Sequence, residues 1–228
     1  MRIAEIFYSI QGEGRLTGVP SAFIRTSGCN LRCTWCDSDY TSWNPEGESL
    51  TVDAILGNVV SFPTRHIVVT GGEPLIAAEI EELCIGLRER KYHITVETAA
   101  TVFKPLACDL ASLSPKLSNS VPFEREGGRH ALKHDQLRLR TDVIQAFMDQ
   151  SDYQLKFVVD RAEDFNEIQD ILERLRGVDA AKVLLMPLGV SPSELQERGH
   201  WIIEECKRYG YRFCPRLQIE LFGNVRGT

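Results

Sequence analysis

The feature that most constrains the fold of this chain is a repeated alternation of short apolar runs with segments of helical periodicity. Short apolar runs bounded by turns are typical of buried strands, whereas apolar residues at steps of three and four indicate a helix. Strands that alternate with helices are expected to be parallel and joined by right-handed crossovers. The strands are predicted at residues 21–26, 66–70, 93–98, 108–113, 154–160 and 182–187, with a last extended piece near residues 211–219.

The predicted helices fill the intervals between these strands. Apolar residues share one helical face in two sets, which are Ile76, Ile80, Leu83 and Leu87, and Phe165, Ile168, Ile171, Leu172 and Leu175. Further helices are expected at residues 51–61, 135–149 and 192–209. Two architectures fit this pattern, an open doubly wound sheet or an incomplete β/α barrel. A full barrel of eight units takes about 250 residues, and only six units are visible in these 228.

The composition is that of an ordinary globular protein, with 43% hydrophobic and 25% charged residues. Because the formal net charge is −6, a nucleic-acid-binding surface is not expected. No apolar run approaches the ~20 residues that cross a bilayer, so no membrane association is expected either. The first residues, MRIAEIFYSIQGEG, lack the apolar core of a signal peptide. We therefore expect a cytoplasmic protein.

Seven cysteines in a reducing compartment indicate metal binding or catalysis rather than a disulfide framework. Three of them, Cys29, Cys33 and Cys36, fall within eight residues, as the thiolates of an iron–sulfur cubane do when one loop wraps its corners. Three ligands instead of four would leave one iron open to a small molecule. The spacing alone also allows a zinc site completed by Asp37 or His66, or three thiols without a metal.

Polar and glycine-rich segments follow the predicted strands. Parallel α/β folds bind ligands at the carboxyl ends of their strands, so these segments predict an active site at one rim of the sheet. In chain order they are GCNLRCTWCDS, TGGEPL, ETAAT and SPKLS after the first four strands, and PLG after the sixth.

The cysteine spacing, with Trp35 directly before the last cysteine, resembles the signature of the radical S-adenosylmethionine superfamily. The segment TGGEP (residues 70–74) resembles the GGEP motif with which that superfamily receives the amino group of S-adenosylmethionine. The resemblance implies an incomplete β/α barrel with about six parallel strands. It also implies one [4Fe-4S] cluster per chain on Cys29, Cys33 and Cys36, with S-adenosylmethionine on the open iron.

The two ends of the chain narrow the family further. SIQGEG (residues 9–14), the run TSGCNLRCTWCDS and the terminal FGNVRGT (residues 222–228) resemble the 7-carboxy-7-deazaguanine synthase family, lyases of queuosine biosynthesis. This resemblance implies conversion of 6-carboxy-5,6,7,8-tetrahydropterin to 7-carboxy-7-deazaguanine with release of ammonia, started by hydrogen abstraction from C6 by a 5′-deoxyadenosyl radical. It also implies a single domain over residues 1–228, with the terminal segments closing the substrate site.

The resemblance assigns substrate contacts position by position. The amide of Gln11 and the carboxylate of Glu13 can read the donors and acceptors of a pterin edge. Arg25 offers a two-pronged donor for the substrate carboxylate, although an ordinary salt bridge is the alternative at that position. The full set of implied substrate residues is Ile10, Gln11, Gly12, Glu13, Arg25, Thr70, Glu97 and Thr228.

A second set of positions matches the family's cofactor contacts. Ser38 matches a ligand of Mg2+, a cation that prefers oxygen donors, and Thr is common in its place. Glu220 stands where many relatives have a substrate-facing His, so the pterin contacts there would differ. The alternative for Lys156 is an ordinary snorkelling lysine. The positions implied to bind S-adenosylmethionine are Trp35, Cys36, Asp37, Gly72, Glu73, Ser114, Pro115, Lys116 and Lys156.

Two competing functions share parts of this pattern. A glycyl-radical-enzyme activating protein uses the same cysteine spacing, but the QGEG start and the GNVRG end argue against it. A metal-stabilised binding protein would need a fourth ligand from the protein. The family resemblance implies a homodimer and an electron donor such as flavodoxin or ferredoxin. The long polar segment at residues 117–134 is open to three interpretations, which are a lid, an interface element and a tolerated surface insertion.

Overall fold

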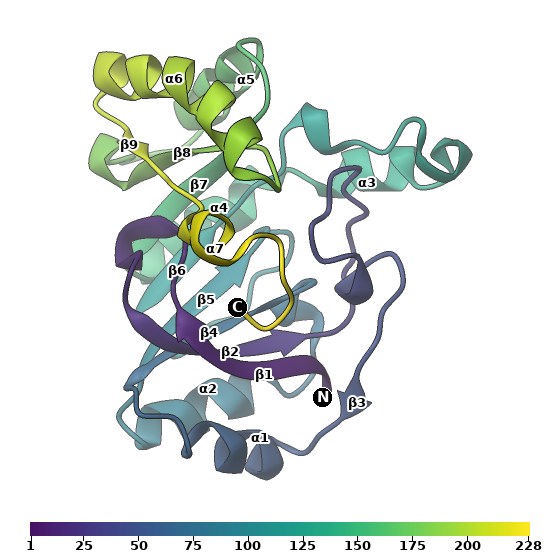
Figure 1. Ribbon diagram of the computed structural model, residues 1–228, viewed down its shortest axis with the longest axis vertical. Helices are drawn as coiled ribbons and strands as arrows, with labels where there is room; N and C mark the ends of the chain where they lie inside the picture. Colours follow the sequence, from purple (N-terminus) through teal and green to yellow (C-terminus); the bar gives the residue numbers. More distant parts are fainter.

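The computed structural model describes residues 1–228, and its strands join in one nine-stranded sheet with the order β3-β1-β2-β4-β5-β6-β7-β8-β9 (Figure 1). Every neighbouring pair from β2–β4 to β8–β9 is parallel, and β1 is antiparallel to both β2 and β3. The strands are β1 (Arg2–Ile10), β2 (Pro20–Thr26), β3 (Glu48–Ser49), β4 (His66–Gly71), β5 (His93–Thr98), β6 (Leu110–Leu113), β7 (Tyr153–Val159), β8 (Val183–Pro187) and β9 (Arg212–Phe213).

The strand order identifies the architecture. From β4 to β9 the strands follow one another in the sheet as they do in the chain, so each crossover advances in the same direction. A doubly wound sheet would reverse its order at a switch point. The two edge strands, β3 and β9, do not pair, so the barrel stays open. The expected incomplete β/α barrel is confirmed, and β9 adds a seventh parallel strand to the six that were predicted.

The α-helices are α1 (Val52–Val59), α2 (Ile80–Glu89), α3 (Ala131–Leu137), α4 (Thr141–Gln150), α5 (Asp164–Glu173), α6 (Pro192–Tyr209) and α7 (Leu217–Phe222). Their boundaries follow local chemistry, as α6 illustrates. Ser191 and Glu194 form a reciprocal capping box before Pro192, and Gly210 ends the helix in the left-handed conformation with φ 72°. None of these helices has both the length and the apolar composition needed to span a membrane.

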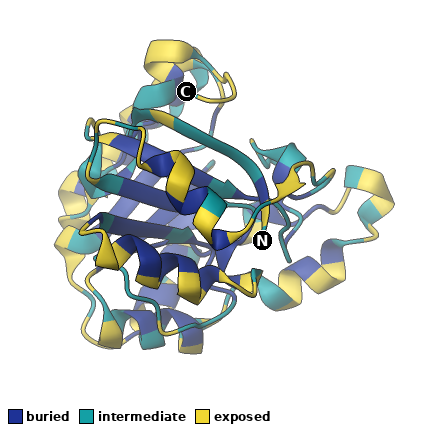
Figure 2. Ribbon diagram, turned by 90° about the horizontal axis from the view of Figure 1, so that it is seen from below, coloured by how far each residue is buried: buried dark blue, intermediate teal, exposed yellow.

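Short 3-10 helices connect these elements and place several loops around the rim. They are η1 (Gly14–Leu16), η2 (Asp39–Thr41), η3 (Pro74–Ile76), η4 (Ser118–Ser120), η5 (Arg125–Gly128) and η6 (Ala180–Lys182). The main hydrophobic core holds 37 buried residues and joins the sheet to the apolar faces of the helices. Figure 2 shows the strands buried behind helices whose outer faces are exposed. All seven residues of β7 are buried, as expected for a central parallel strand.

The sequence-based prediction did not include β1 and β3, and three of its other details differ from the structure. Residues 211–219 are extended only at β9, and a helix, α7, begins at Leu217. The single helix predicted at residues 135–149 is two helices, because Arg140 takes a non-helical conformation (φ −124°, ψ 85°) and starts α4. Just before this break, Arg138 donates a 2.5 Å hydrogen bond to Glu167 of α5. Ile76 belongs to η3, and α2 begins only at Ile80.

Candidate active site

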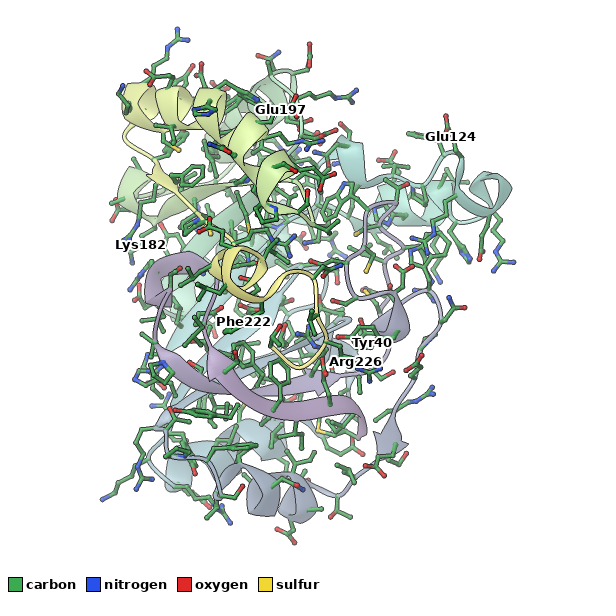
Figure 3. All side chains as sticks on the ribbon, viewed as in Figure 1. Tyr40, Glu124, Lys182, Glu197, Phe222 and Arg226 are labelled. Carbon is green, nitrogen blue, oxygen red and sulfur yellow. The ribbon has the colours of Figure 1, made fainter.

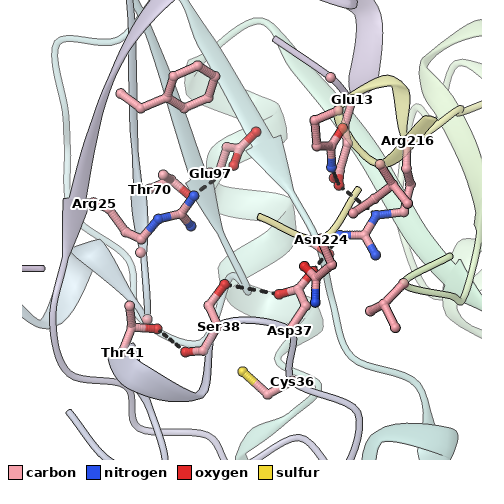
Figure 4. Close-up of a pocket in the computed structure, with 18 of the residues that line it drawn as sticks. Glu13, Arg25, Cys36, Asp37, Ser38, Thr41, Thr70, Glu97, Arg216 and Asn224 are labelled. Carbon is pink, nitrogen blue, oxygen red and sulfur yellow. Dashed lines mark hydrogen bonds and ion pairs between the residues drawn. The ribbon is translucent and has the colours of Figure 1, made fainter. Parts of the chain in front are cut away.

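The carboxyl ends of the parallel strands open into a cavity of about 340 Å³ (Figure 4), a size typical of small-molecule sites. Figure 1 shows α7 and the tail that follows it lying in front of the strands. Residues 223–228 of this tail and residues 10–13, at the end of β1 and directly after it, line the cavity together with the strand ends. Segments from both ends of the chain therefore meet at the predicted rim.

All but two of the predicted site residues line this cavity. The two exceptions are Glu73 and Pro115. Those that line it are Ile10, Gln11, Gly12, Glu13, Arg25, Cys29, Cys33, Trp35, Cys36, Asp37, Ser38, Thr70, Gly72, Glu97, Ser114, Lys116, Lys156 and Thr228.

The three clustered cysteines lie on the loop that follows β2, and all are free thiols. The amide of Leu31 donates to Cys29 Sγ at 3.3 Å, and Ser42 Oγ lies 3.2 Å from Cys36 Sγ. Burial raises the pKa of the Cys29 and Cys33 thiols to about 12 and also raises the pKa of Cys36. These thiols are therefore protonated without a metal, and bound iron would supply the positive charge that deprotonates them.

The donor set fits an iron–sulfur cubane. No three His, Cys, Asp or Glu side chains are arranged to hold a single metal ion. Cubane thiolates bind different irons, so they need not meet at one point. Hydrogen bonds to the sulfurs, of the kind that Leu31 and Ser42 form here, tune clusters of this type.

The TGGE turn packs against the backbone of the cysteine loop. Gly72 donates to the carbonyl of Thr26 at 3.1 Å, and Glu73 donates to that of Gly28 at 2.9 Å. A Cβ atom on Gly72 would meet the Gly28 carbonyl oxygen at 2.1 Å, and one on Gly71 (φ 135°) would meet that of Thr26 at 2.2 Å. Both positions therefore require glycine because the two loops approach each other closely.

The Glu73 carboxylate is fully buried and already occupied by protein donors. It accepts hydrogen bonds from Thr98 Oγ1 at 2.7 Å, from the Ala99 amide at 2.9 Å and from the Leu75 amide at 3.2 Å. Burial raises its pKa, and these three donors oppose that shift. Glu73 thus connects the TGGE turn to the end of β5 from behind the cavity.

A network of charges joins four segments of the cavity wall, and all of its members except the more exposed Asp37 are largely buried. Glu13 pairs with Lys156 of β7 through one carboxylate oxygen, and Arg216 Nε lies 3.0 Å from the other. Arg216 also pairs with Asp37, which follows the last cluster cysteine, and donates to the Gly189 carbonyl at 2.6 Å. Figure 4 shows Glu13, Arg216 and Asp37 in a row along the wall.

The network keeps its members charged. Burial alone would raise the pKa of Glu13, but the charges of Lys156 and Arg216 outweigh it and hold this pKa well below its ordinary value. Burial and Arg216 compete in the same way at Asp37, whose pKa is also lowered. Burial would lower the pKa of Lys156, but Glu13 raises it above its ordinary value. Lys156 is therefore an ion-paired residue and not a snorkelling lysine.

A second polar chain crosses the strand ends. Gln11 Nε2 donates to one oxygen of Glu97 at 3.1 Å, and Thr70 Oγ1 donates to the other at 2.9 Å. Beside them the rings of Phe7 and Phe23 stack with centroids 4.8 Å apart and form an apolar part of the cavity lining. This arrangement offers both hydrogen-bonding groups and a flat apolar surface to a planar heterocycle.

Arg25 lies at the end of β2 and is held through one nitrogen. Its Nε donates to Glu5 at 2.6 Å, which leaves both terminal amino groups without a hydrogen-bond partner. Glu5 also accepts from Tyr40 at 2.8 Å and from Arg226 at 3.3 Å. Arg226 lies over the Tyr40 ring (Figure 3), 4.1 Å from its centroid, and donates to the Ala4 carbonyl at 3.0 Å. These contacts fasten the tail to β1.

The remaining predicted residues lie around the cysteine loop. Ser38 Oγ donates to Asp37 at 3.0 Å. Lys116 Nζ donates to Ser114 at 2.8 Å and lies 5.7 Å from the centroid of the Trp35 ring. The cavity therefore has cationic and hydroxyl groups beside the cysteines.

Sequence reasoning missed Arg216 and Gln218, which both reach Glu13. It also placed the substituted His position at Glu220, which is exposed and does not line the cavity. Gln218 lines it instead and donates to Glu13 at 2.9 Å. Positions 218 and 220 lie on α7, where residues two apart point about 200° away from each other around the helix axis, so Gln218 faces the cavity and Glu220 faces away from it.

Comparisons with known proteins agree with this geometry. Residues 23–120 match the model of the radical SAM superfamily. The chain is 45% identical to the 7-carboxy-7-deazaguanine synthase of Rhodopirellula baltica, over 99% of this chain and 88% of the relative. It is 41% identical to the enzyme of the same name from Halobacterium salinarum, over 99% and 92%. The crystal structure of QueE from Escherichia coli shares the fold, with a TM-score of 0.68 over 93% of this chain and 92% of that one, at 24% identity.

Proposed function

The chain belongs to the 7-carboxy-7-deazaguanine synthase family of radical S-adenosylmethionine enzymes, and from this premise we propose how its cavity performs the family's reaction. The enzyme is a lyase that converts 6-carboxy-5,6,7,8-tetrahydropterin to 7-carboxy-7-deazaguanine with release of ammonia. The observation that carries the assignment of roles is the meeting of the three cysteines, Arg25 and the Gln11–Glu97–Thr70 chain in one cavity.

The enzyme uses a [4Fe-4S] cluster and S-adenosylmethionine. Cys29, Cys33 and Cys36 would hold the cluster and leave one iron for S-adenosylmethionine. When bound and reduced, this pair supplies the radical that abstracts hydrogen from the substrate. The chain itself contributes position, exclusion of water and fixed charges.

The S-adenosylmethionine contacts fall on the cluster side of the cavity. Trp35 offers an aromatic face, and Ser114 and Lys116 offer a hydroxyl and a cation beside it. Asp37 and the backbone at Gly72 complete this side. Glu73 and Pro115 would act through the shape of their loops, because neither lines the cavity.

The substrate contacts fall on the opposite side. The free amino groups of Arg25 would grip the substrate carboxylate as a two-pronged donor. Gln11, Glu97 and Thr70 would read the pterin edge, and the Phe7–Phe23 stack would support its ring. Glu13 and Lys156 neutralise each other, so their role is to shape the wall beside Ile10 and Gly12. Thr228 would bring the terminal carboxylate to the site.

A magnesium ion would complete the site, with Ser38 as one of its oxygen ligands. The Ser38 hydroxyl lines the cavity next to the Asp37 carboxylate, which supports this role. The cation would bind substrate oxygens and stabilise negative charge as the ring rearranges. Adding Mg2+ to cluster-loaded protein that has been freed of magnesium should lower KM for the pterin, and Ser38→Ala should weaken this response while Ser38→Thr preserves it.

The proposal also covers the domain organisation, compartment, electron donor and oligomeric state of the enzyme. We propose that residues 1–228 act as one catalytic domain in the cytoplasm, where thiols stay reduced. The electron donor would be a small redox protein such as flavodoxin or ferredoxin, and the assembly a homodimer. The continuous nine-stranded sheet supports the single domain. Sedimentation equilibrium tests the dimer directly.

The decisive experiment is anaerobic incubation of reconstituted protein with S-adenosylmethionine, a reductant and 6-carboxy-5,6,7,8-tetrahydropterin. The expected result is about four irons per chain and the absorbance of the deazapurine. Cys29→Ala, Cys33→Ala and Cys36→Ala should each lose the iron and the product. The glycyl-radical alternative is not favoured by the named relatives. Cleavage of S-adenosylmethionine without conversion of the pterin would overturn the proposed substrate.

A further inference from the structure

The polar segment at residues 117–134, to which the proposed function assigns no role, contacts the loop that carries the cysteines. We call residues 27–43 the cluster loop and residues 117–137 the clasp. The clasp contains η4, η5 and α3. On its inner side the cluster loop rests on the TGGE turn, so it lies between two supports.

The contacts of the clasp converge on Cys33. This residue is only 8% exposed and packs with Leu31 in a small apolar cluster. The residues on both sides of Cys33 donate their backbone amides to the clasp. Arg32 N–H donates to His134 Nδ1 at 3.0 Å, and Thr34 N–H donates to the Ser120 carbonyl at 2.8 Å. The peptide that presents the Cys33 thiol is thus fixed at both ends.

His134 is itself held in one orientation. It is almost fully buried, at 1% exposure. Because Nδ1 accepts from Arg32, the hydrogen of a neutral ring resides on Nε2, which donates to Ser120 Oγ at 2.9 Å. Ser120 Oγ in turn donates to the Leu117 carbonyl at 2.6 Å. Each polar atom of this chain has a partner, so the ring can neither flip nor turn without breaking a buried hydrogen bond.

The outer arm of the clasp holds the far end of the cluster loop. Arg125 forms an ion pair with Asp39 at 2.5 Å and lies over the Trp43 ring, 3.9 Å from its centroid. The Trp43 indole donates to the carbonyl of Cys33 at 2.9 Å. Arg125 therefore supports the same cysteine through Trp43.

We propose that the clasp is a positioning element of the iron–sulfur site, with His134 as its central residue, and that it sets how firmly Cys33 retains the cluster. A ligand whose neighbouring amides are fixed cannot swing away from its iron, so the cluster should exchange iron slowly. This inference rests on the assignment of the cluster to the three cysteines. The sequence allowed residues 117–134 to be a lid, an interface element or a surface insertion. The proposal assigns this segment a different role, which is to support the loop that binds the cofactor.

Two substitutions separate the contacts of His134. Asn places an acceptor near the Nδ1 position and keeps the bond from Arg32, whereas Gln places a donor near the Nε2 position and keeps only the bond to Ser120. Lys133→Ala, at the exposed neighbouring position of α3, is the matched control. The measurements are iron content, the rate of iron transfer to bathophenanthroline disulfonate under argon, and the electron paramagnetic resonance spectrum of the reduced cluster. Hydrogen exchange of the Arg32 amide in cluster-free protein reports on the loop independently.

We expect His134→Gln to speed iron loss about tenfold, to broaden the spectrum and to speed exchange at Arg32, as the loss of one buried hydrogen bond implies. His134→Asn should stay within about threefold of the unsubstituted protein, and Lys133→Ala should equal it. Equal rates for the Gln and Asn variants, or unchanged exchange at Arg32, would overturn the proposal. If His134→Gln does not fold, Arg125→Ala tests the outer arm, and iron loss at the unsubstituted rate in that variant also overturns it. An unsubstituted protein without iron would instead overturn the cluster assignment.

Discussion

Arg216 Nε lies 3.0 Å from Glu13 Oε1, which ties the helix before the C-terminal tail to the loop after the first strand. The same guanidinium pairs with Asp37 next to the last cluster cysteine. One buried side chain thus links the substrate side of the cavity to its cluster side. Removal of Arg216 takes one of two charged partners from the buried Glu13 carboxylate, and loss of a buried partner costs about 3–5 kcal/mol.

Arg216→Gln is therefore expected to destabilise the protein by about 3 kcal/mol and to raise KM for the pterin more than it lowers kcat. The reason is that Glu13 and the cavity wall lose their position, whereas Cys29, Cys33 and Cys36 keep hydrogen bonds that do not involve Arg216. Urea denaturation and steady-state kinetics measure the two effects.

The double variant Glu13→Gln/Arg216→Gln provides the control for that substitution. Because it removes both charges of the pair, its loss of stability should be smaller than the sum of the two single losses, with a coupling energy of about 1–3 kcal/mol. Strictly additive losses would mean that the two groups do not interact in solution.

Arg25→Lys should raise KM for the pterin about 10- to 100-fold with little change in the free energy of unfolding. The lysine can still pair with Glu5, but it cannot present two parallel donors to a carboxylate. A substrate analogue without its carboxylate should bind the two proteins equally. Arg15→Lys, whose residue pairs with Asp152 outside the cavity, serves as the control and should leave KM unchanged. A preserved KM in Arg25→Lys would contradict the assigned role.

Gly72→Ala should prevent stable incorporation of the cluster. Its Cβ would lie 2.1 Å from the carbonyl oxygen of Gly28, so the TGGE turn and the cluster loop would have to separate. The expected readout is iron content well below four per chain after reconstitution. Gly57→Ala in α1 is the matched control, because its Cβ meets nothing within 4 Å. That substitution should stabilise the protein by about 0.5–1 kcal/mol, and full iron content in Gly72→Ala would show that the loops can move apart.

Six of the parallel strands were predicted well because each is a short apolar run, and polar or glycine-rich residues follow most of them. β1 was missed, because its residues are mostly half-buried and show neither strict alternation nor a continuous apolar run. The break between α3 and α4 was missed for a different reason. Next to the break Arg138 meets Glu167, a partner 29 residues away, and local periodicity does not reveal such a contact.

Those residues of the candidate site that belong to a sequence motif could be predicted. Those that are joined by ion pairs between distant parts of the chain could not. Cys29, Cys33 and Cys36 are picked out by their spacing together with the TGGEP motif that follows the next predicted strand. Arg216 gave no such signal, since its partners Glu13 and Asp37 lie 203 and 179 positions away in the chain. Only the folded barrel brings these groups together, which is why the network appears in the structure and not in the sequence pattern.

The last prediction concerns the protonation of His134. Burial lowers its pKa from 6.5 to about 4, and the nearby charge of Arg138 adds to the effect. The folded chain therefore binds fewer protons than the unfolded chain between pH 4 and 6.5, so the free energy of unfolding falls as the pH is lowered through this range. The loss from this residue reaches at most about 3 kcal/mol at pH 4 and is absent above about pH 6.5.

His134→Asn should flatten this part of the pH profile in cluster-free protein, because the substituted chain has no ring to protonate. Other groups titrate in the same range, so the difference between the two profiles isolates the contribution of His134. The ring resonances of the five histidines provide the direct measurement. One imidazole should keep its Nε2–H form down to about pH 4 and disappear in the variant. A resonance for His134 that titrates near 6.5 would mean that the ring is open to water and that the Arg32 amide is not held by it.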